Sequence, residues 1–140
     1  MKLLILSIGK VKSKPVQELV DDYAERVGHY VTTALFAAKD ERQALGKLEP
    51  NDLFIVLDER GKQMGSLELA EFLRDHQLRG TKRIVFFIGG PEGHGERLRE
   101  RARIVLGLSK MTFPHELTQA ILLEQLYRAY TIIKGEPYHK

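Results

Sequence analysis

The stretch that decides the fold is Ile84-Val85-Phe86-Phe87-Ile88-Gly89-Gly90-Pro91-Glu92-Gly93-His94-Gly95. Its first five residues are continuously apolar, a pattern typical of a parallel strand buried on both faces. Four glycines follow, and a backbone without β-carbons can come close to a ligand. Because open α/β sheets bind ligands at the carboxyl ends of their strands, the stretch predicts a ligand site. A tight strand-to-helix turn without a ligand is the open alternative.

Strand and helix patterns alternate on both sides of this stretch. Apolar or β-branched runs predict strands, and apolar residues at helical spacing predict helices. Residues 58–63 are expected to form a charged loop, and Ser66 to cap the helix after it. This alternation predicts one α/β domain over residues 1–140, with a mostly parallel sheet and helices on both faces. The other expected strands are 2–8, 30–38, 52–57 and 103–106, and the expected helices are 15–27, 40–48, 66–78, 96–102 and 116–133.

Length and composition set the broad class of the protein. A chain of 140 residues suits one domain that buries roughly two-thirds of the surface of its unfolded chain. The apolar N-terminus is too short to span a bilayer, and its lysines follow the apolar run, unlike those of a secretory signal. The chain has no cysteine, so we expect no disulfide and a cytoplasmic location. The 22 basic and 19 acidic residues permit an anionic partner such as RNA without demanding one.

Spacing excludes several common enzyme sites. A P-loop needs a lysine and a hydroxyl residue after its glycines, and His94-Gly95-Glu96 supplies neither. The glycine spacing and later acidic residue of a Rossmann dinucleotide site are absent in the required form. The histidines are scattered without a His-x-x-x-His pair, so no metal site is expected. There is no Gly-x-Ser-x-Gly elbow and no cysteine nucleophile.

Three segments are expected to meet at the carboxyl edge of the sheet: Leu57, residues 89–95 and residues 108–114. A cleft between them would be lined by backbone and apolar side chains, with Ser109 and Thr112 as polar groups. Such a lining suits a neutral heteroaromatic ligand, such as adenine, better than a triphosphate. The alternative is that the third segment is simply another strand with its turn.

The C-terminus is a second candidate region. Arg128, Tyr138, His139 and Lys140 offer hydrogen-bond donors, an aromatic face and a group that titrates near neutral pH. These groups suit phosphate contacts and base stacking, which are ordinary means of RNA recognition. A frayed chain end without a function is the alternative.

Four runs, taken together and in this order, resemble one protein family. They are Phe87-Ile88-Gly89-Gly90-Pro91-Glu92-Gly93, Leu108-Ser109-Lys110-Met111-Thr112-Phe113-Pro114-His115, Glu124-Gln125-Leu126-Tyr127-Arg128-Ala129 and Pro137-Tyr138-His139-Lys140. The chain is similar over essentially its whole length to the RlmH family, the ribosomal large-subunit pseudouridine N3-methyltransferases of the SPOUT class.

The resemblance implies a SPOUT domain over residues 1–140, with a trefoil knot in its C-terminal part, and a homodimer. It implies S-adenosylmethionine as the cofactor and no metal. The implied substrate is a pseudouridine of 23S rRNA on the assembled ribosome, methylated at N3. The residues implied to hold the cofactor are Leu57, Gly89, Leu108, Ser109, Lys110, Met111, Thr112 and Phe113.

A hypothesis for the chemistry follows from this resemblance. His139 assists loss of the N3 proton, Arg128 stabilises the resulting ring anion, and Tyr138 stacks on or positions the base. Because the tail can reach a neighbouring subunit, a site shared across the dimer is open beside one within a single chain. Two other classes also stay open: a non-catalytic RNA-binding dimer, and a small-ligand-binding module whose glycine loop holds an anion.

Overall fold

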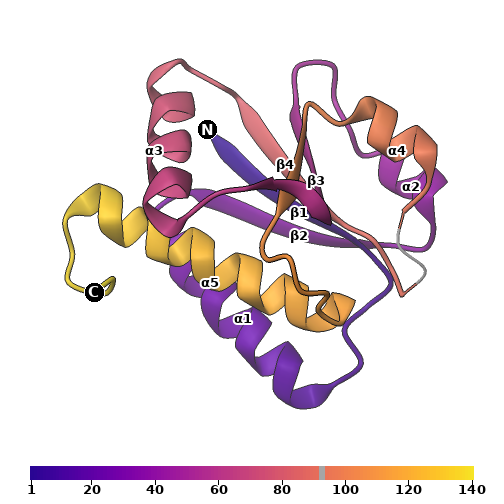
Figure 1. The fold of residues 1–140 in the computed structure, drawn as a ribbon, viewed down its shortest axis with the longest axis horizontal. Helices are drawn as coiled ribbons and strands as arrows, with labels where there is room; N and C mark the ends of the chain where they lie inside the picture. The colour runs from indigo at the N-terminus through magenta and orange to yellow at the C-terminus, as the bar shows by residue number, and fades with distance from the viewer. Residues whose placement is uncertain (92–93) are drawn as a thin grey trace.

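The computed structural model describes residues 1–91 and 94–140, a single α/β layered fold (Figure 1). Glu92 and Gly93, part of the glycine stretch predicted to approach a ligand, lie outside the described residues. The elements in chain order are β1 (Lys2–Ile8), α1 (Lys14–Gly28), β2 (Thr32–Ala38), α2 (Glu41–Leu45), β3 (Leu53–Gln63), α3 (Ser66–Leu78), β4 (Arg83–Ile88), α4 (Glu96–Arg101), β5 (Ile104–Gly107) and α5 (His115–Lys134).

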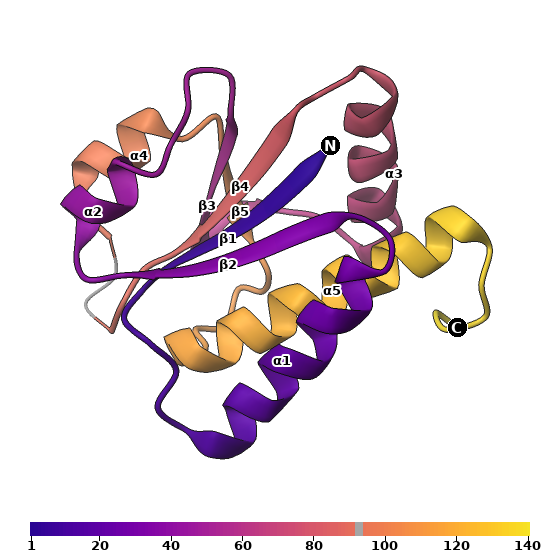
Figure 2. The same ribbon diagram turned by 180° about the vertical axis from the view of Figure 1, so that it is seen from behind.

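The sheet has five strands in the order β2-β1-β4-β3-β5, and every neighbouring pair is parallel. Alternate residues of a strand point to opposite faces, and both faces are apolar here. Leu3 and Ile5 of β1 pack into the core beneath α1, α3 and α5, whereas Leu4 and Leu6 pack beneath α2 and α4. The views from front and back show the helices divided between the two faces in this way (Figures 1 and 2). The predicted parallel sheet with helices on both faces is confirmed.

The third strand differs from its prediction. Residues 58–63 were expected to form a loop, but β3 continues through them and pairs again with β5. Leu57 and Lys62 are both in register with Leu106, so the four residues between them form a bulge. The charged side chains of Glu59, Arg60 and Lys62 are exposed, but Asp58 is buried. The charges could not reveal that the backbone of Lys62 and Gln63 pairs with β5.

Gly61 lies in this bulge, and its replacement by alanine is expected to destabilise the fold. A β-carbon there would lie 2.5 Å from the carbonyl oxygen of Val105 and 2.9 Å from the amide nitrogen of Leu106. Both are backbone atoms, so β3 and β5 would have to separate, at a cost of about 1–3 kcal/mol. Urea unfolding measures this loss. Gly28→Ala is the control, because its β-carbon would meet nothing within 4 Å, and equal unfolding midpoints for the two variants would contradict the prediction.

Other differences are local. The helix predicted to begin with a Ser66 cap has Gly65 at its N-cap, and the hydroxyl of Ser66 instead donates to Oε1 of Gln125 at 2.7 Å. Leu67 was expected to face inward but is 62% exposed. Residues 108–113 form no strand, so the alternative that this segment is simply another strand with its turn is wrong. No helix within the described residues is long and apolar enough to cross a membrane.

Candidate functional site

A cavity of about 790 Å³ lies at the bulge of β3, at the carboxyl end of β4 and beside the loop after β5. Small-molecule sites typically occupy about 300–1,000 Å³, so this volume suits a ligand of moderate size. The parallel strands end at one edge of the sheet, which is why segments far apart in sequence meet there. The predicted cofactor-holding residues that line the cavity are Leu57, Gly89, Leu108, Ser109, Met111, Thr112 and Phe113. Lys110 is the exception: it is exposed and lies outside the lining.

The loop after β5 supplies one wall of the cavity. The hydroxyl oxygen of Ser109 accepts a hydrogen bond from the amide of Met111 at 3.0 Å, which holds the loop in a turn and leaves the hydroxyl hydrogen free to donate. The loop can lie close to the bulge of β3 because residue 107 is glycine. A β-carbon at Gly107 would come within 3.1 Å of the carbonyl oxygens of Asp58 and Gly61.

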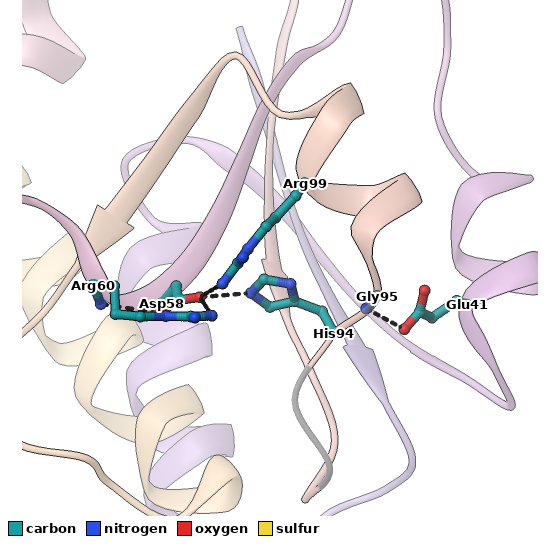
Figure 3. A network of polar contacts seen from close by, with 6 residues as sticks. All are labelled: Glu41, Asp58, Arg60, His94, Gly95 and Arg99. Atoms are coloured by element: carbon teal, nitrogen blue, oxygen red, sulfur yellow. Dashed lines mark hydrogen bonds and ion pairs between the residues drawn. The ribbon is translucent and has the colours of Figure 1, made fainter.

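The lining of the cavity also carries a polar cluster centred on Asp58, the residue after Leu57 (Figure 3). Arg60 donates from its backbone amide and from Nε to Oδ1, at 2.9 and 3.0 Å. Three further donors converge on Oδ2: Nη2 of Arg60 at 2.7 Å, Nη2 of Arg99 at 2.8 Å and Nε2 of His94 at 3.1 Å. The side chains of Asp58 and His94 are only 4% and 5% exposed. The cluster therefore joins β3, α4 and the loop before α4.

The same view shows a second polar contact at the start of α4. The carboxylate of Glu41, in α2, accepts a hydrogen bond from the amide of Gly95 at 2.7 Å (Figure 3). It thereby satisfies one of the free amides at the N-terminus of α4. Together with Asp58, this contact fixes both sides of the segment that carries His94.

Acid is expected to weaken the fold through Asp58. Burial by itself raises the pKa of this carboxyl, but hydrogen bonds from the backbone and side chain of Arg60, with the charges of Arg60 and His94, hold the pKa below its ordinary value of 3.8. A carboxyl whose pKa is lower in the folded state than in the unfolded state stabilises the fold at pH values above its unfolded-state pKa. This contribution is lost as the pH falls through its folded-state pKa.

Asp58→Asn is therefore expected to cost about 2 kcal/mol at pH 7, a cost that shrinks below about pH 3.8. Urea unfolding of the two proteins at pH 7 and pH 3 measures the difference. Asp21→Asn, on the exposed side of α1, is the control and is expected to change little at either pH. If Asp58→Asn lowers the free energy of unfolding by the same amount at both pH values, the expected pH dependence is contradicted.

The C-terminal tail is fixed by another polar cluster, centred on Glu124. This carboxylate accepts hydrogen bonds from Nη2 of Arg128 and from the hydroxyl of Tyr138, each at 2.7 Å. Nη1 of Arg128 lies 3.0 Å from Nδ1 of His139. A guanidinium can only donate, so Nδ1 accepts, and His139 is neutral with its proton on Nε2. The three residues predicted to be catalytic thus lie in one cluster.

Aromatic packing surrounds Tyr138. Its ring meets that of Tyr127 edge-on with centroids 4.7 Å apart, and the guanidinium carbon of Arg128 lies 4.9 Å from its centroid. Burial, followed by hydrogen bonds with Tyr23 and Glu124, raises the pKa of the Tyr138 hydroxyl above its usual range. The hydroxyl therefore stays protonated at neutral pH and serves as a donor.

The cavity lies at the N-terminal end of α5, whereas the tail cluster lies against the second half of this helix. The chain leaves the far end of α5 to form the tail (Figures 1 and 2). His115, at the start of α5, lines the cavity, whereas Arg128 follows it thirteen residues later. At 1.5 Å per residue this separates the two positions by about 20 Å along the helix. Within one chain, the predicted cofactor residues and the predicted catalytic residues therefore occupy two separate places.

Sequence reasoning missed the Asp58 cluster. Asp58 and its partners His94 and Arg99 are separated by 36 and 41 residues, so no spacing rule joins them. Glu124 was also missed, although its spacing of four from Arg128 on a helix is a recognisable ion-pair signal. Among the described residues, no group of three or more side chains is arranged to hold a metal ion.

Sequence comparison matches residues 1–139 to the family described as predicted SPOUT methyltransferase. A protein of Coprothermobacter proteolyticus named ribosomal RNA large subunit methyltransferase H is 45% identical over 140 residues and is covered completely, as is this chain. A protein of the same name from Geotalea daltonii is 44% identical, with 99% of each chain covered.

Two solved structures are similar in fold. A probable methylase family protein from Haemophilus influenzae has a TM-score of 0.61 at 10% identity, with 99% of this chain and 70% of that chain covered. The SpoU methyltransferase AviRb from Streptomyces viridochromogenes, in complex with AdoMet, has a TM-score of 0.50 at 12% identity, with 93% and 57% covered. At these identities the likeness concerns the fold alone.

Proposed function

Because this chain belongs to the SPOUT methyltransferase family, and within it to the family of ribosomal RNA large subunit methyltransferase H, we propose that it methylates N3 of a pseudouridine in 23S rRNA with S-adenosylmethionine as the methyl donor. The single observation that carries this proposal is the cavity. Its lining holds the residues that the family resemblance implies for the cofactor, apart from Lys110. One SPOUT domain over residues 1–140, the trefoil knot and action on the assembled ribosome in the cytoplasm belong to the same proposal.

The cavity residues fit such a cofactor in kind. Leu57, Leu108 and Phe113 offer apolar surface to a heteroaromatic ring, and Ser109 and Thr112 offer hydroxyls at its edge. When bound, S-adenosylmethionine supplies an electrophilic methyl group on a sulfonium. The protein's contribution is to align this methyl group with N3, and such alignment can lower the activation barrier by on the order of 7–11 kcal/mol at most.

N3 of a uracil-type ring carries a proton at neutral pH, and that proton must leave. His139 is the proposed acceptor, assisted by the charge of Arg128 near the developing ring anion. In the structure, Nδ1 of His139 already accepts from Arg128, and the proton sits on Nε2. His139 can therefore take up a proton only when Nδ1 turns from Arg128 toward the base. Tyr138 is proposed to position the base as a donor and stacking surface.

A homodimer is part of the proposal because one chain keeps its two sets of residues apart. The distance of about 20 Å along α5 exceeds the reach of any side chain. Donation of the tail of one subunit to the cavity of its partner would join them. The separation of the two clusters supports such a shared site.

Methyl-labelled S-adenosylmethionine, incubated with the protein and with ribosomes that lack the modification, tests the function. We expect label in one pseudouridine of assembled ribosomes and little in free 23S rRNA. His139→Ala should leave cofactor binding intact and depress turnover, and equal activity would remove His139 from the mechanism. If calorimetry detects no binding of S-adenosylmethionine, the methyltransferase proposal is contradicted and a non-catalytic RNA-binding protein is favoured.

A further inference from the structure

Arg60 is a cationic side chain that lines the cavity and is held in a fixed orientation. Its Nε and Nη2 atoms form a two-pronged pair with the carboxylate of Asp58, at 3.0 and 2.7 Å. A guanidinium has five donor hydrogens, and this pair leaves others, on Nη1 above all, available to a ligand. The side chain of Arg60 remains 69% exposed, so these donors are accessible. A planar guanidinium in a fixed orientation is suited to a carboxylate.

The carboxylate of Asp58 is fully used by its own neighbours. It accepts five hydrogen bonds, from Arg60, His94 and Arg99, so it has little remaining capacity for a ligand. Two guanidinium charges, those of Arg60 and Arg99, face the one carboxylate charge of Asp58, and the cluster carries an excess positive charge. Glu59, the neighbour of Arg60, also lines the cavity and supplies a separate negative charge.

We propose that Arg60, positioned by Asp58, binds the α-carboxylate of the amino-acid end of S-adenosylmethionine, and that Glu59 accepts from its ammonium group. This inference rests on the proposed function. Adjacent charges of opposite sign on one wall match a zwitterion, whose two charges are separated by a single carbon. An RNA phosphate, the other anion that could reach this wall, would be repelled by Glu59. The observations therefore favour the cofactor.

His94 and Arg99 act as positioning residues in this proposal. They touch Oδ2 of Asp58 from α4 and from the loop before it, and so hold the carboxylate against Arg60 (Figure 3). Removal of either should weaken binding less than removal of Arg60, because the two-pronged contact between Arg60 and Asp58 stays in place.

Calorimetry with two ligands tests the proposal without any catalytic step. S-adenosylmethionine has the amino-acid end, whereas methylthioadenosine lacks it and keeps the adenosine and sulfur. Arg60→Ala is expected to weaken S-adenosylmethionine about 10–100-fold, the cost of one charged hydrogen-bond contact, and to leave methylthioadenosine within about twofold. Arg101→Ala, at the exposed end of α4, is the matched control and should change neither affinity.

Two further variants separate binding from folding. Arg60→Lys keeps the positive charge but loses the planar, bidentate donor geometry of the guanidinium, and should recover only part of the affinity for S-adenosylmethionine. Asp58→Asn should release Arg60 and show the same preference for methylthioadenosine. Equal weakening of both ligands in all three variants would indicate a general disturbance of the cavity and would overturn the proposal.

The remaining outcomes also decide between the interpretations. Unchanged affinity for S-adenosylmethionine in Arg60→Ala, with a raised KM for ribosomes, would overturn the proposal in favour of an RNA phosphate contact. Failure of the unaltered protein to bind either ligand would overturn the proposed function itself. Binding of both ligands by the unaltered protein with equal affinity would overturn only the inference about Arg60.

Discussion

A mixture of two inactive variants is expected to regain methyltransferase activity. The first variant, Tyr138→Ala with His139→Ala, removes the tail side chains that we propose act on the base. Removal of a general base alone typically lowers turnover by about 10²–10⁴-fold. The second variant, Thr112→Trp, places a bulky ring on an exposed cavity-lining position and should block the cofactor while sparing the core. Each variant alone should be nearly inactive.

If the tail of one subunit completes the cavity of the other, a mixed dimer has one intact site. Random exchange makes half of the dimers mixed, so activity should recover to about a quarter of the normal value. Native mass spectrometry monitors the exchange, and mixtures assayed before exchange serve as the control. Mixed dimers without recovered activity would place the tail and the cavity of the same chain in one site, and a monomer in solution would contradict the dimer.

Asp52→Ala is expected to produce the largest loss of stability. Asp52 accepts a two-pronged contact from Arg83, with Nε at 2.8 Å and Nη2 at 2.6 Å, at the start of β4. Their side chains are 4% and 19% exposed, so removal of Asp52 leaves a largely buried guanidinium. Its remaining partners are the carbonyl oxygen of Lys47 at 2.8 Å and the exposed carboxylate of Glu49 at 3.8 Å. Such a loss costs about 3–5 kcal/mol for a buried pair, and the partial exposure of Arg83 puts our expectation near 3 kcal/mol.

The pKa of Asp52 agrees with this role. Burial would raise it, but hydrogen bonds from Arg83 and the amide of Glu49, with the charge of Arg83, lower it below the ordinary value. Urea unfolding at neutral pH measures the effect. Asp22→Ala breaks the exposed pair with Arg26, whose side chains are 52% and 44% exposed, and should cost less than about 0.5 kcal/mol. Similar losses in the two variants would show that burial of the pair does not matter here.

The sequence was sufficient where a single element determines its own pattern. The apolar runs of β1 and β4 predicted buried strands, and the end of β1 at Ile8 is confirmed. It was insufficient where pairing depends on a distant element. The second half of β3 contains charged residues and resembles a loop, because its partner Leu106 lies more than forty residues away.

The candidate site divides in the same way. The three segments around the cavity could be predicted to meet because parallel strands end at one edge of the sheet. The contacts of Asp58 with His94 and Arg99 could not, since they depend on where the side chains of α4 and of the preceding loop lie after folding. Likewise, nothing in the sequence indicates that Arg128 and Leu57 are held far apart within one chain.

The attachment of the tail to Glu124 has a consequence for subunit association. Binding partners that must first order a flexible segment lose about 0.5–1.5 kcal/mol for each side chain that they immobilise. Here Tyr138 and His139 are already held by Glu124 and Arg128 of their own helix. In a dimer built as proposed, the conformational entropy of these side chains is lost during folding of the monomer. The two subunits can then dock nearly as rigid bodies. We expect their affinity for each other to be higher than it would be with a flexible tail.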